Sequence, residues 1–299
     1  MAFVQNIKKN WLHYFVYISV AFLAYTLIKR EYIVLPENIN YKYFSLSFFV
    51  LFVGVFVQGL SYKVILKNFG YYITARDSLI AFGMTVLSRY VPGKFWVHLG
   101  RAAYIRDHYN YPYNELAFIS LNSQFIGIWI VVLFCSLGFV IINISFLIKI
   151  IIVVFWLILT LIIFTRYFHR IAQWLVLKIS GREIKIPNLS FKENLRVFPV
   201  IIAYWFLYAF AFHLLALSLY ADVGYLSLMY FPISAIVGIA AIFAPGGLGA
   251  REATLVGLLT LGGTTAVLAT TIAAFSRIWF LAGELFGFVL GIVIRLSKK

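Results

Sequence analysis

Four basic side chains gather in one short segment and together could bind a phosphate group. Lys94, His98 and Arg101 are spaced so that they share one face of a helix, and Arg89 precedes them. No carboxylate occurs in residues 81–106 to neutralise these cations. Buried cations without partners are unfavourable in a membrane, so we expect a lipid phosphate beside Arg89 and Lys94. The alternative, which we prefer for Arg101, is that the side chain extends to the lipid headgroups at the membrane surface.

A second group of ionisable residues lies in the C-terminal part of the chain and carries no net charge. Arg251 and Glu252 are adjacent, and Arg277 and Glu284 lie two helical turns apart on one face of a later apolar segment. Two ion pairs would neutralise all four, for instance Arg251 with Glu284 and Glu252 with Arg277. Such a network either fastens one segment to another or takes part in transport by breaking and re-forming, and the sequence leaves both interpretations open.

Each group of charges lies beside a Pro-Gly interruption of an apolar segment. The two prolines are 153 residues apart (245 minus 92), and the same offset superimposes the apolar segments around them. This pattern indicates an internal repeat with a broken helix at the centre of each half, where membrane transporters tend to bind substrate. The residues that we expect at the two tips are Pro92, Gly93, Pro245, Gly246, Gly247 and Gly249.

The composition predicts an all-α polytopic membrane protein that forms a single integral membrane domain over residues 1–299. Hydrophobic residues make up 63% of the chain and charged residues 12%, with a mean hydropathy of +0.95. The net charge of +15 comes from residues that flank apolar segments, which points to a membrane and not to nucleic acid as the partner. With one cysteine, Cys135, and dispersed histidines, we expect no metal site and no cofactor.

The lengths of the apolar runs predict six full spans and two broken segments, or eight helical membrane segments. The arms of each broken segment have about 14 residues, or ~21 Å, too short for a ~30 Å hydrocarbon core, which favours two re-entrant hairpins. The predicted spans are Trp11–Ile28, Tyr43–Gly59, Asn114–Ile142, Ile148–Thr165, Val197–Tyr220 and Ala266–Ile294, and the broken segments are Asp77–Asp107 and Leu228–Leu261.

The distribution of basic residues predicts that both termini lie in the cytoplasm. The loop from Arg166 to Arg196 is the richest in Lys and Arg, and it falls on the same side as the termini when the hairpins are re-entrant. Each half then has three crossings, so repeat 1, about residues 1–146, and repeat 2, about 147–299, are inverted. If the hairpins cross the membrane fully, each half has four crossings and the repeats are parallel.

Two motifs resemble the signature regions of the lysylphosphatidylglycerol synthase transmembrane family. They are the segment from Ser88 to Trp96, with sequence SRYVPGKFW, and the segment from Pro245 to Glu252, with sequence PGGLGARE. The resemblance extends over nearly the whole chain. It implies a lipid-handling membrane domain of the flippase type. We expect no synthesis of lysylphosphatidylglycerol, because the chain lacks the soluble aminoacyl-transferase domain of the two-part proteins.

We therefore predict a lipid translocase in the cytoplasmic (inner) membrane, and not an enzyme. Its substrate would be an anionic phospholipid or a polyprenyl-phosphate-linked lipid, bound at the first hairpin. The sequence contains no phosphate-binding loop of the Gly-x-x-x-x-Gly-Lys-Ser/Thr type, so we expect no direct use of ATP. The alternatives are a membrane lipid-glycosyltransferase and a non-catalytic partner of a glycosyltransferase or another envelope-biosynthesis enzyme.

Overall fold

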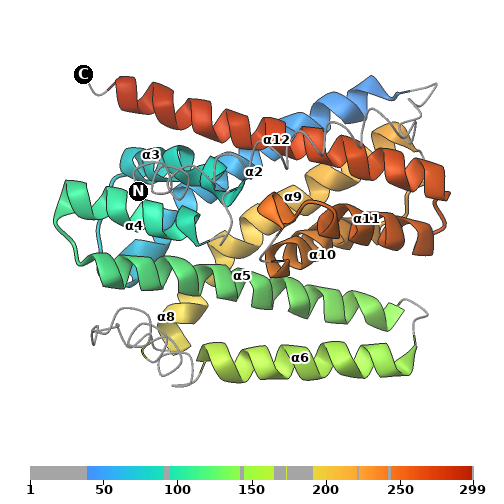
Figure 1. Cartoon of the computed structure of the whole chain (residues 1–299), viewed down its shortest axis with the longest axis horizontal. Coiled ribbons are helices and arrows are strands. Elements are labelled where there is room, and N and C mark those ends of the chain that lie inside the picture. Colours follow the sequence, from blue (N-terminus) through green and yellow to red (C-terminus); the bar gives the residue numbers. More distant parts are fainter. Residues whose placement is uncertain are drawn as a thin grey trace, which may run out of the picture. The chain divides into compact units, whose positions relative to one another are not determined.

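The computed structural model describes residues 39–90, 95–141, 145–164, 173, 191–220, 222–241 and 244–297, and within them all regular structure is helical (Figure 1). The helices are α2 (Tyr41–Asn68), α3 (Ala75–Val86), α4 (Trp96–Tyr109), α5 (Tyr113–Ile141), α6 (Phe146–Phe164), α8 (Phe191–Arg196), α9 (Phe198–Leu219), α10 (Ser227–Ala240), α11 (Ala250–Leu261) and α12 (Ala266–Leu296). Two 3₁₀ turns, η1 (Leu87–Tyr90) and η2 (Pro245–Gly247), belong to the two broken segments.

Four described helices are long and apolar enough to cross a membrane, and they confirm four of the six predicted spans. These helices are α2, α5, α9 and α12. The predicted span Ile148–Thr165 corresponds to α6, whose apolar part, Lys149–Phe164, is shorter. The predicted span Trp11–Ile28 lies outside the described residues. The chain is therefore a multi-pass membrane protein.

The two broken segments appear as pairs of short helices joined through a 3₁₀ turn. The first contains α3, η1 and α4, and the second contains α10, η2 and α11. Each of these helices has 12 or 14 residues, as the apolar run lengths predicted. The two predicted tip residues of the first segment, Pro92 and Gly93, lie outside the described residues, and so does the predicted phosphate ligand Lys94. The second break is described from Ala244 onward.

The chain divides into two compact units, and both draw on the two halves of the sequence. Unit 1 comprises residues 1–52, 86–97 and 208–285, and unit 2 comprises 53–85, 98–207 and 286–299. The boundaries fall inside α2, α9 and α12, so each of these long helices contributes a part to each unit. These compact units do not test the two predicted repeats, 1–146 and 147–299, because a repeat is defined by symmetry and not by compactness. The repeats therefore stay a prediction.

In unit 1, α10 packs against α11 (Figure 1), and α10 also joins α9 and α12 in a cluster of aromatic side chains. The ring of Phe231 on α10 is the centre of this cluster. Its centroid lies 5.6 Å from that of Phe212 on α9, and 5.5 Å and 5.3 Å from those of Trp279 and Phe280 on α12. Edge and offset contacts between rings stabilise such a core beyond the area that they bury. The cluster fixes α12 beside the second broken segment.

In unit 2, α3 crosses the C-terminal part of α12 at glycines. A Cβ atom built on Gly83 would lie 2.5 Å from the carbonyl oxygen of Gly287 and 2.8 Å from Cα of Gly291. Small residues four positions apart allow two membrane helices to approach this closely. Elsewhere in this unit α5 and α6 run side by side, and the indole Nε1 of Trp129 donates a 2.7 Å hydrogen bond to Thr160.

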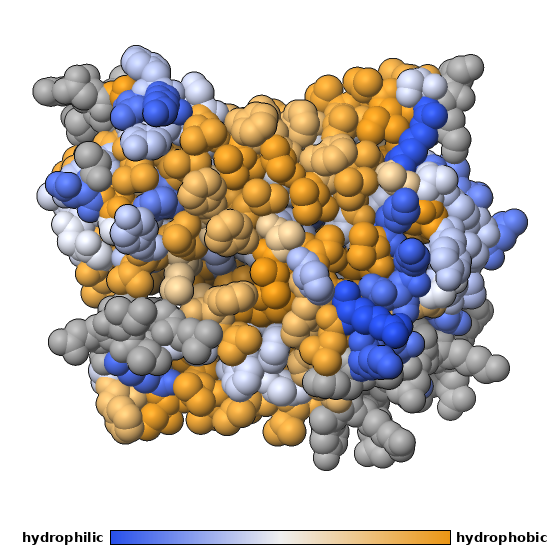
Figure 2. Space-filling view, turned by 180° about the vertical axis from the view of Figure 1, so that it is seen from behind, coloured by the Kyte–Doolittle hydropathy of each residue, from blue (hydrophilic) through white to orange (hydrophobic). Residues whose placement is uncertain are grey.

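Large apolar side chains are exposed along one face of α12 and over much of α6. The α12 residues recur every three or four positions, as on one helix face, and they are Ile278, Leu281, Leu285, Val289 and Val293. Figure 2 shows one side of the molecule, on which hydrophobic side chains cover most of the surface. Exposed apolar area of this extent fits helices that face lipid.

Candidate functional site

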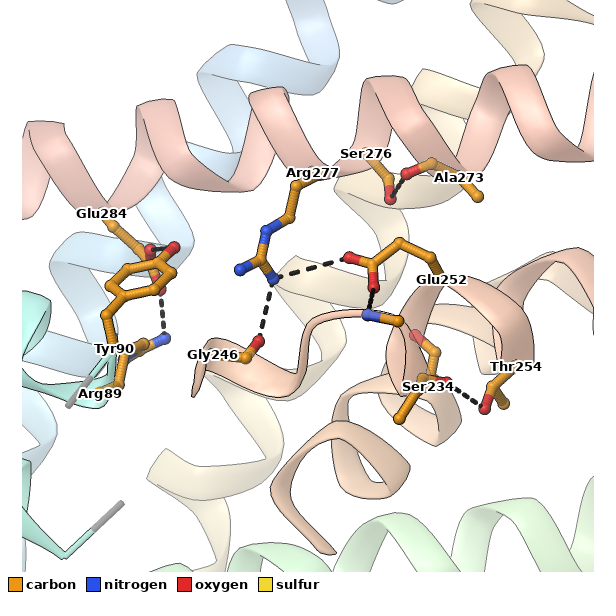
Figure 3. Close-up of polar contacts among 12 residues, drawn as sticks. Arg89, Tyr90, Ser234, Gly246, Glu252, Thr254, Ala273, Ser276, Arg277 and Glu284 are labelled. Carbon is orange, nitrogen blue, oxygen red and sulfur yellow. Dashed lines mark hydrogen bonds and ion pairs between the residues drawn. The ribbon is translucent and has the colours of Figure 1, made fainter. Parts of the chain in front are cut away.

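The two helix breaks contact each other in unit 1, and ionisable side chains surround the contact (Figure 3). Turn η1 supplies Arg89 and Tyr90, and η2 supplies the backbone of Gly246. The contact is close, because a Cβ atom on Gly246 would lie 2.7 Å from the ring of Tyr90. The first turn of α11 and the middle of α12 supply the other charges. We call this group of Arg89, Tyr90, Arg251, Glu252, Arg277 and Glu284 the break cluster.

Arg89 forms an ion pair with Glu284 of α12. Its Nη1 lies 2.7 Å from Oε1 of Glu284, and the hydroxyl of Tyr90 donates a 2.5 Å hydrogen bond to Oε2 of the same carboxylate. The side chain of Glu284 is 3% exposed and that of Arg89 is 25% exposed. The expectation that no carboxylate neutralises Arg89 is therefore wrong, because it considered only the neighbouring sequence and the partner lies 195 residues further on (284 minus 89).

Arg277 ties α12 to the second break. Its Nη1 donates a 2.9 Å hydrogen bond to the carbonyl oxygen of Gly246 and lies 3.6 Å from Oε1 of Glu252. The other carboxylate oxygen of Glu252 accepts a 2.8 Å hydrogen bond from the backbone N–H of Gly249, so it caps the N-terminus of α11. The expected pair of Glu252 with Arg277 is thus present, as Figure 3 shows.

Arg251 forms no ion pair with a carboxylate of the described residues, so the expected pair with Glu284 is wrong. The residue is 4% exposed, and its guanidinium carbon lies 4.6 Å and 4.8 Å from the ring centroids of Phe231 and Phe280. Within the described part of the chain, its Nε and Nη2 atoms have no hydrogen-bond partner. The carboxylate of Glu284 is instead occupied by Arg89 and Tyr90.

The break cluster therefore carries a formal charge of +1. Three arginines contribute +3, and two glutamates contribute −2. The charge is partly accessible, because the side chains of Arg89 and Glu252 are 25% and 21% exposed, whereas that of Arg277 is 7% exposed. An excess of positive charge of this kind favours an anion over a cation.

Glycines give the second break a backbone that other residues would strain. Gly246, Gly247 and Gly249 have φ values of 58°, 72° and 82°, in the left-handed region that glycine adopts most easily. A Cβ atom on Gly247 would also lie 2.7 Å from Cα of Gly238 on α10. At Gly247 the second break therefore depends on glycine for its close approach to the backbone of α10.

Two predicted phosphate ligands, His98 and Arg101, belong to unit 2, and both are 8% exposed. The Nδ1 atom of His98 lies 2.9 Å from the hydroxyl of Ser120, and the guanidinium of Arg101 lies 5.0 Å from the ring centroid of Phe82. Arg101 is thus packed inside its unit, and the interpretation that it extends to the membrane surface is wrong. Among the described residues, no group of three or more His, Cys, Asp or Glu side chains could hold a metal ion.

Sequence reasoning missed three members of this arrangement: Tyr90, Phe231 and Phe280. One signal was available, because Glu284 is the one acidic residue of α12 and a buried carboxylate needs hydrogen-bond donors around it. The aromatic residues gave no signal, since phenylalanine and tyrosine are abundant throughout the chain.

The sequence family described as "Lysylphosphatidylglycerol synthase TM region" matches residues 11–287, which is nearly the whole chain. No curated protein and no solved structure matches the chain.

Proposed function

We propose that this chain, which belongs to the lysylphosphatidylglycerol synthase transmembrane family, moves an anionic lipid between the two leaflets of its membrane. One observation carries the proposal: the two helix breaks meet at a cluster of buried and half-buried charges that is one positive charge in excess, and the unpaired Arg251 is among the buried ones. A membrane protein that holds such a charge away from water has a place for an anion.

The electrostatics of the break cluster favour a ligand over a purely structural role. An unpaired charge in a low-dielectric interior costs several kcal/mol, by order of magnitude. Glu284 and Glu252 already compensate Arg89 and Arg277, but neither pairs with Arg251. A lipid phosphate supplies the missing charge and comes from the surrounding membrane, so it needs no aqueous path.

The lengths of the short helices support the re-entrant topology. Helices α3, α4, α10 and α11 have 12 or 14 residues, or ~18–21 Å at 1.5 Å per residue, which is short of a ~30 Å hydrocarbon core. We propose that each pair enters and leaves on one face, from opposite sides, as two inverted repeats. Both termini then lie on the cytoplasmic side of the inner membrane, and the two tips meet inside it.

This topology gives the lipid headgroup a site that both membrane faces can reach in turn. In transporters of this design, one half moves relative to the other around a fixed site at the broken helices. Here each break is held to α12, the first by the Arg89–Glu284 pair and the second by the hydrogen bond from Arg277 to Gly246. We propose that these contacts loosen and re-form while Arg251 retains the phosphate, and that the movement is downhill or coupled to an ion gradient or the membrane potential.

Purified protein in liposomes tests the proposal. A fluorescent anionic phospholipid that is quenched only in the outer leaflet reports movement between leaflets. We expect faster movement with the wild-type protein than in empty liposomes. Arg251→Gln, Arg89→Gln and Glu284→Gln should each slow it in folded protein. Arg106→Gln is the matched control, because this arginine is 50% exposed and pairs with the adjacent Asp107. Wild-type rates in all three variants would contradict the site, and no movement by the wild-type protein would contradict the function.

A further inference from the structure

We infer that Arg251 binds the phosphodiester group of a lipid through the edge formed by its Nε and Nη2 atoms, and that the site selects headgroups with one negative charge and no amine. The inference deepens the proposed function and rests on it. It assigns the atoms that hold the headgroup and the chemical class of lipid that they accept.

The geometry of the guanidinium supports the assignment of Nε and Nη2 as the atoms that bind the phosphodiester. Nε–H and one Nη2–H of an arginine point in the same direction, and together they match two oxygens of one phosphate or carboxylate. In Arg251 these are the two nitrogens that have no hydrogen-bond partner among the described residues, although the side chain is 4% exposed. A complete two-pronged donor edge is thus buried without an acceptor.

The described surroundings of Arg251 are aromatic and basic, and among them no group takes the place of an anion. The rings of Phe231 and Phe280 hold the guanidinium, and an aromatic ring attracts a cation but does not satisfy two parallel N–H donors. Arg251 and Arg277 belong to the same cluster of charges, and two guanidinium groups in one low-dielectric site repel each other. An anion beside Arg251 would therefore be attracted by two arginines at once.

The charge of the break cluster supports the selectivity for headgroups with one negative charge and no amine. A phosphodiester has one negative charge shared by two non-bridging oxygens, so it neutralises the cluster and fits the donor edge in a single group. A phosphate monoester brings about −1.5 to −2, which leaves the buried site negative. An aminoacylated headgroup brings one or more ammonium groups, which Arg251 and Arg277 repel. The expected class is an amine-free anionic glycerophospholipid, with phosphatidylglycerol as the probe.

Binding in detergent measures this selectivity without reference to movement. Native mass spectrometry and lipid-induced shifts in melting temperature should rank phosphatidylglycerol above phosphatidic acid, phosphatidylcholine and lysyl-phosphatidylglycerol. Arg251→Lys keeps the charge but removes the two-pronged edge, so it should weaken phosphatidylglycerol binding by about tenfold, as the loss of one charge-assisted hydrogen bond predicts. Arg251→Gln should abolish the preference, and Arg106→Gln should leave it unchanged.

The lipid-free stability of the same variants separates a binding role from a structural one. Removing an uncompensated buried charge should raise the melting temperature of the lipid-free protein in Arg251→Gln, whereas removing a structural arginine should lower it. A lowered melting temperature with unchanged phosphatidylglycerol binding would overturn the inference, and so would equal binding of all four lipids. If Arg251→Gln does not fold, the wild-type ranking and Arg251→Lys still decide.

The outcome is distinguishable from that of the proposed function. If the protein binds phosphatidylglycerol selectively through Arg251 but moves no lipid in liposomes, the binding site stands and the proposed translocase function is wrong. If the protein moves lipid but its phosphatidylglycerol binding does not depend on Arg251, the proposed translocase function stands and the role of Arg251 is wrong.

Discussion

Neutralising Arg89 should destabilise the protein more than neutralising Glu284, although the two side chains form one ion pair. The reason is the charge that each substitution leaves behind. Arg89→Gln leaves the carboxylate of Glu284, which is 3% exposed, with the hydroxyl of Tyr90 as its remaining close donor. Glu284→Gln leaves the guanidinium of Arg89, which is 25% exposed and can be hydrated.

The structure sets the size of the effect. Breaking a buried pair by removing one partner costs about 3–5 kcal/mol. We expect about 4 kcal/mol for Arg89→Gln, and about 2 kcal/mol for Glu284→Gln because water screens the arginine that remains. The double variant leaves neither of these two charges unpaired, so it should cost less than Arg89→Gln alone, about 3 kcal/mol. The coupling free energy of the cycle should then be about 3 kcal/mol, from about 4 plus 2 minus 3.

Reversible unfolding in mixed micelles, titrated with a denaturing detergent and followed by tryptophan fluorescence, gives the free energies of unfolding. The same cycle on Arg106 and Asp107 is the control, because that pair is 50% and 57% exposed and should couple by about 0.5 kcal/mol or less. Equal costs for the two single variants, or a coupling no larger than that of the control, would refute the contact between the first break and α12.

Three further substitutions test the backbone of the helix crossings and the charge at the second break by the same titration. Gly247→Ala should lower the free energy of unfolding by about 2 kcal/mol or more, because φ is 72° and the methyl would lie 2.7 Å from Cα of Gly238. Gly257→Ala is the control, because this glycine lies in a helix with open space around it, and the substitution should be neutral or stabilising. Gly83→Ala should cost about 2 kcal/mol because the methyl would meet a backbone oxygen of α12 at 2.5 Å, and a neutral result would contradict that crossing. Glu252→Gln should change stability by less than about 1 kcal/mol, since the amide oxygen still caps α11, but should slow lipid movement; wild-type movement would show that its charge is dispensable.

The sequence predicted the broken segments well because their signals are local. Proline and glycine interrupt a helix wherever they occur inside an apolar run, and run length alone separates a short arm from a full span. The predicted segment Asp77–Asp107 corresponds to α3 through α4, residues 75–109, and Leu228–Leu261 corresponds to α10 through α11, residues 227–261. The pair of Glu252 with Arg277 was also within reach, because the second break and α12 are neighbours along the chain.

The partner of Arg89 was beyond sequence reasoning because it depends on the tertiary packing of the two breaks. Sequence reasoning paired Glu284 with Arg251, because it looked for partners only among the four charges of the C-terminal group. The fold instead brings η1 against η2 and α12, which places Arg89 and Tyr90 on the carboxylate. Because Glu284 pairs with Arg89, the unpaired charge of the break cluster is Arg251 in the first turn of α11 and not Arg89 in the first broken segment, where it was expected from the sequence.

A buried arginine without an anion is a cost that folding alone does not require. A leucine or methionine could occupy the place of Arg251 beside Phe231 and Phe280 without removing a charge from water. An anion that binds only the folded protein offsets that cost by mass action, in proportion to its concentration relative to the dissociation constant. Stability without lipid and affinity for lipid should therefore change in opposite directions at this residue. At Arg277, which supports the backbone of Gly246, both should change in the same direction.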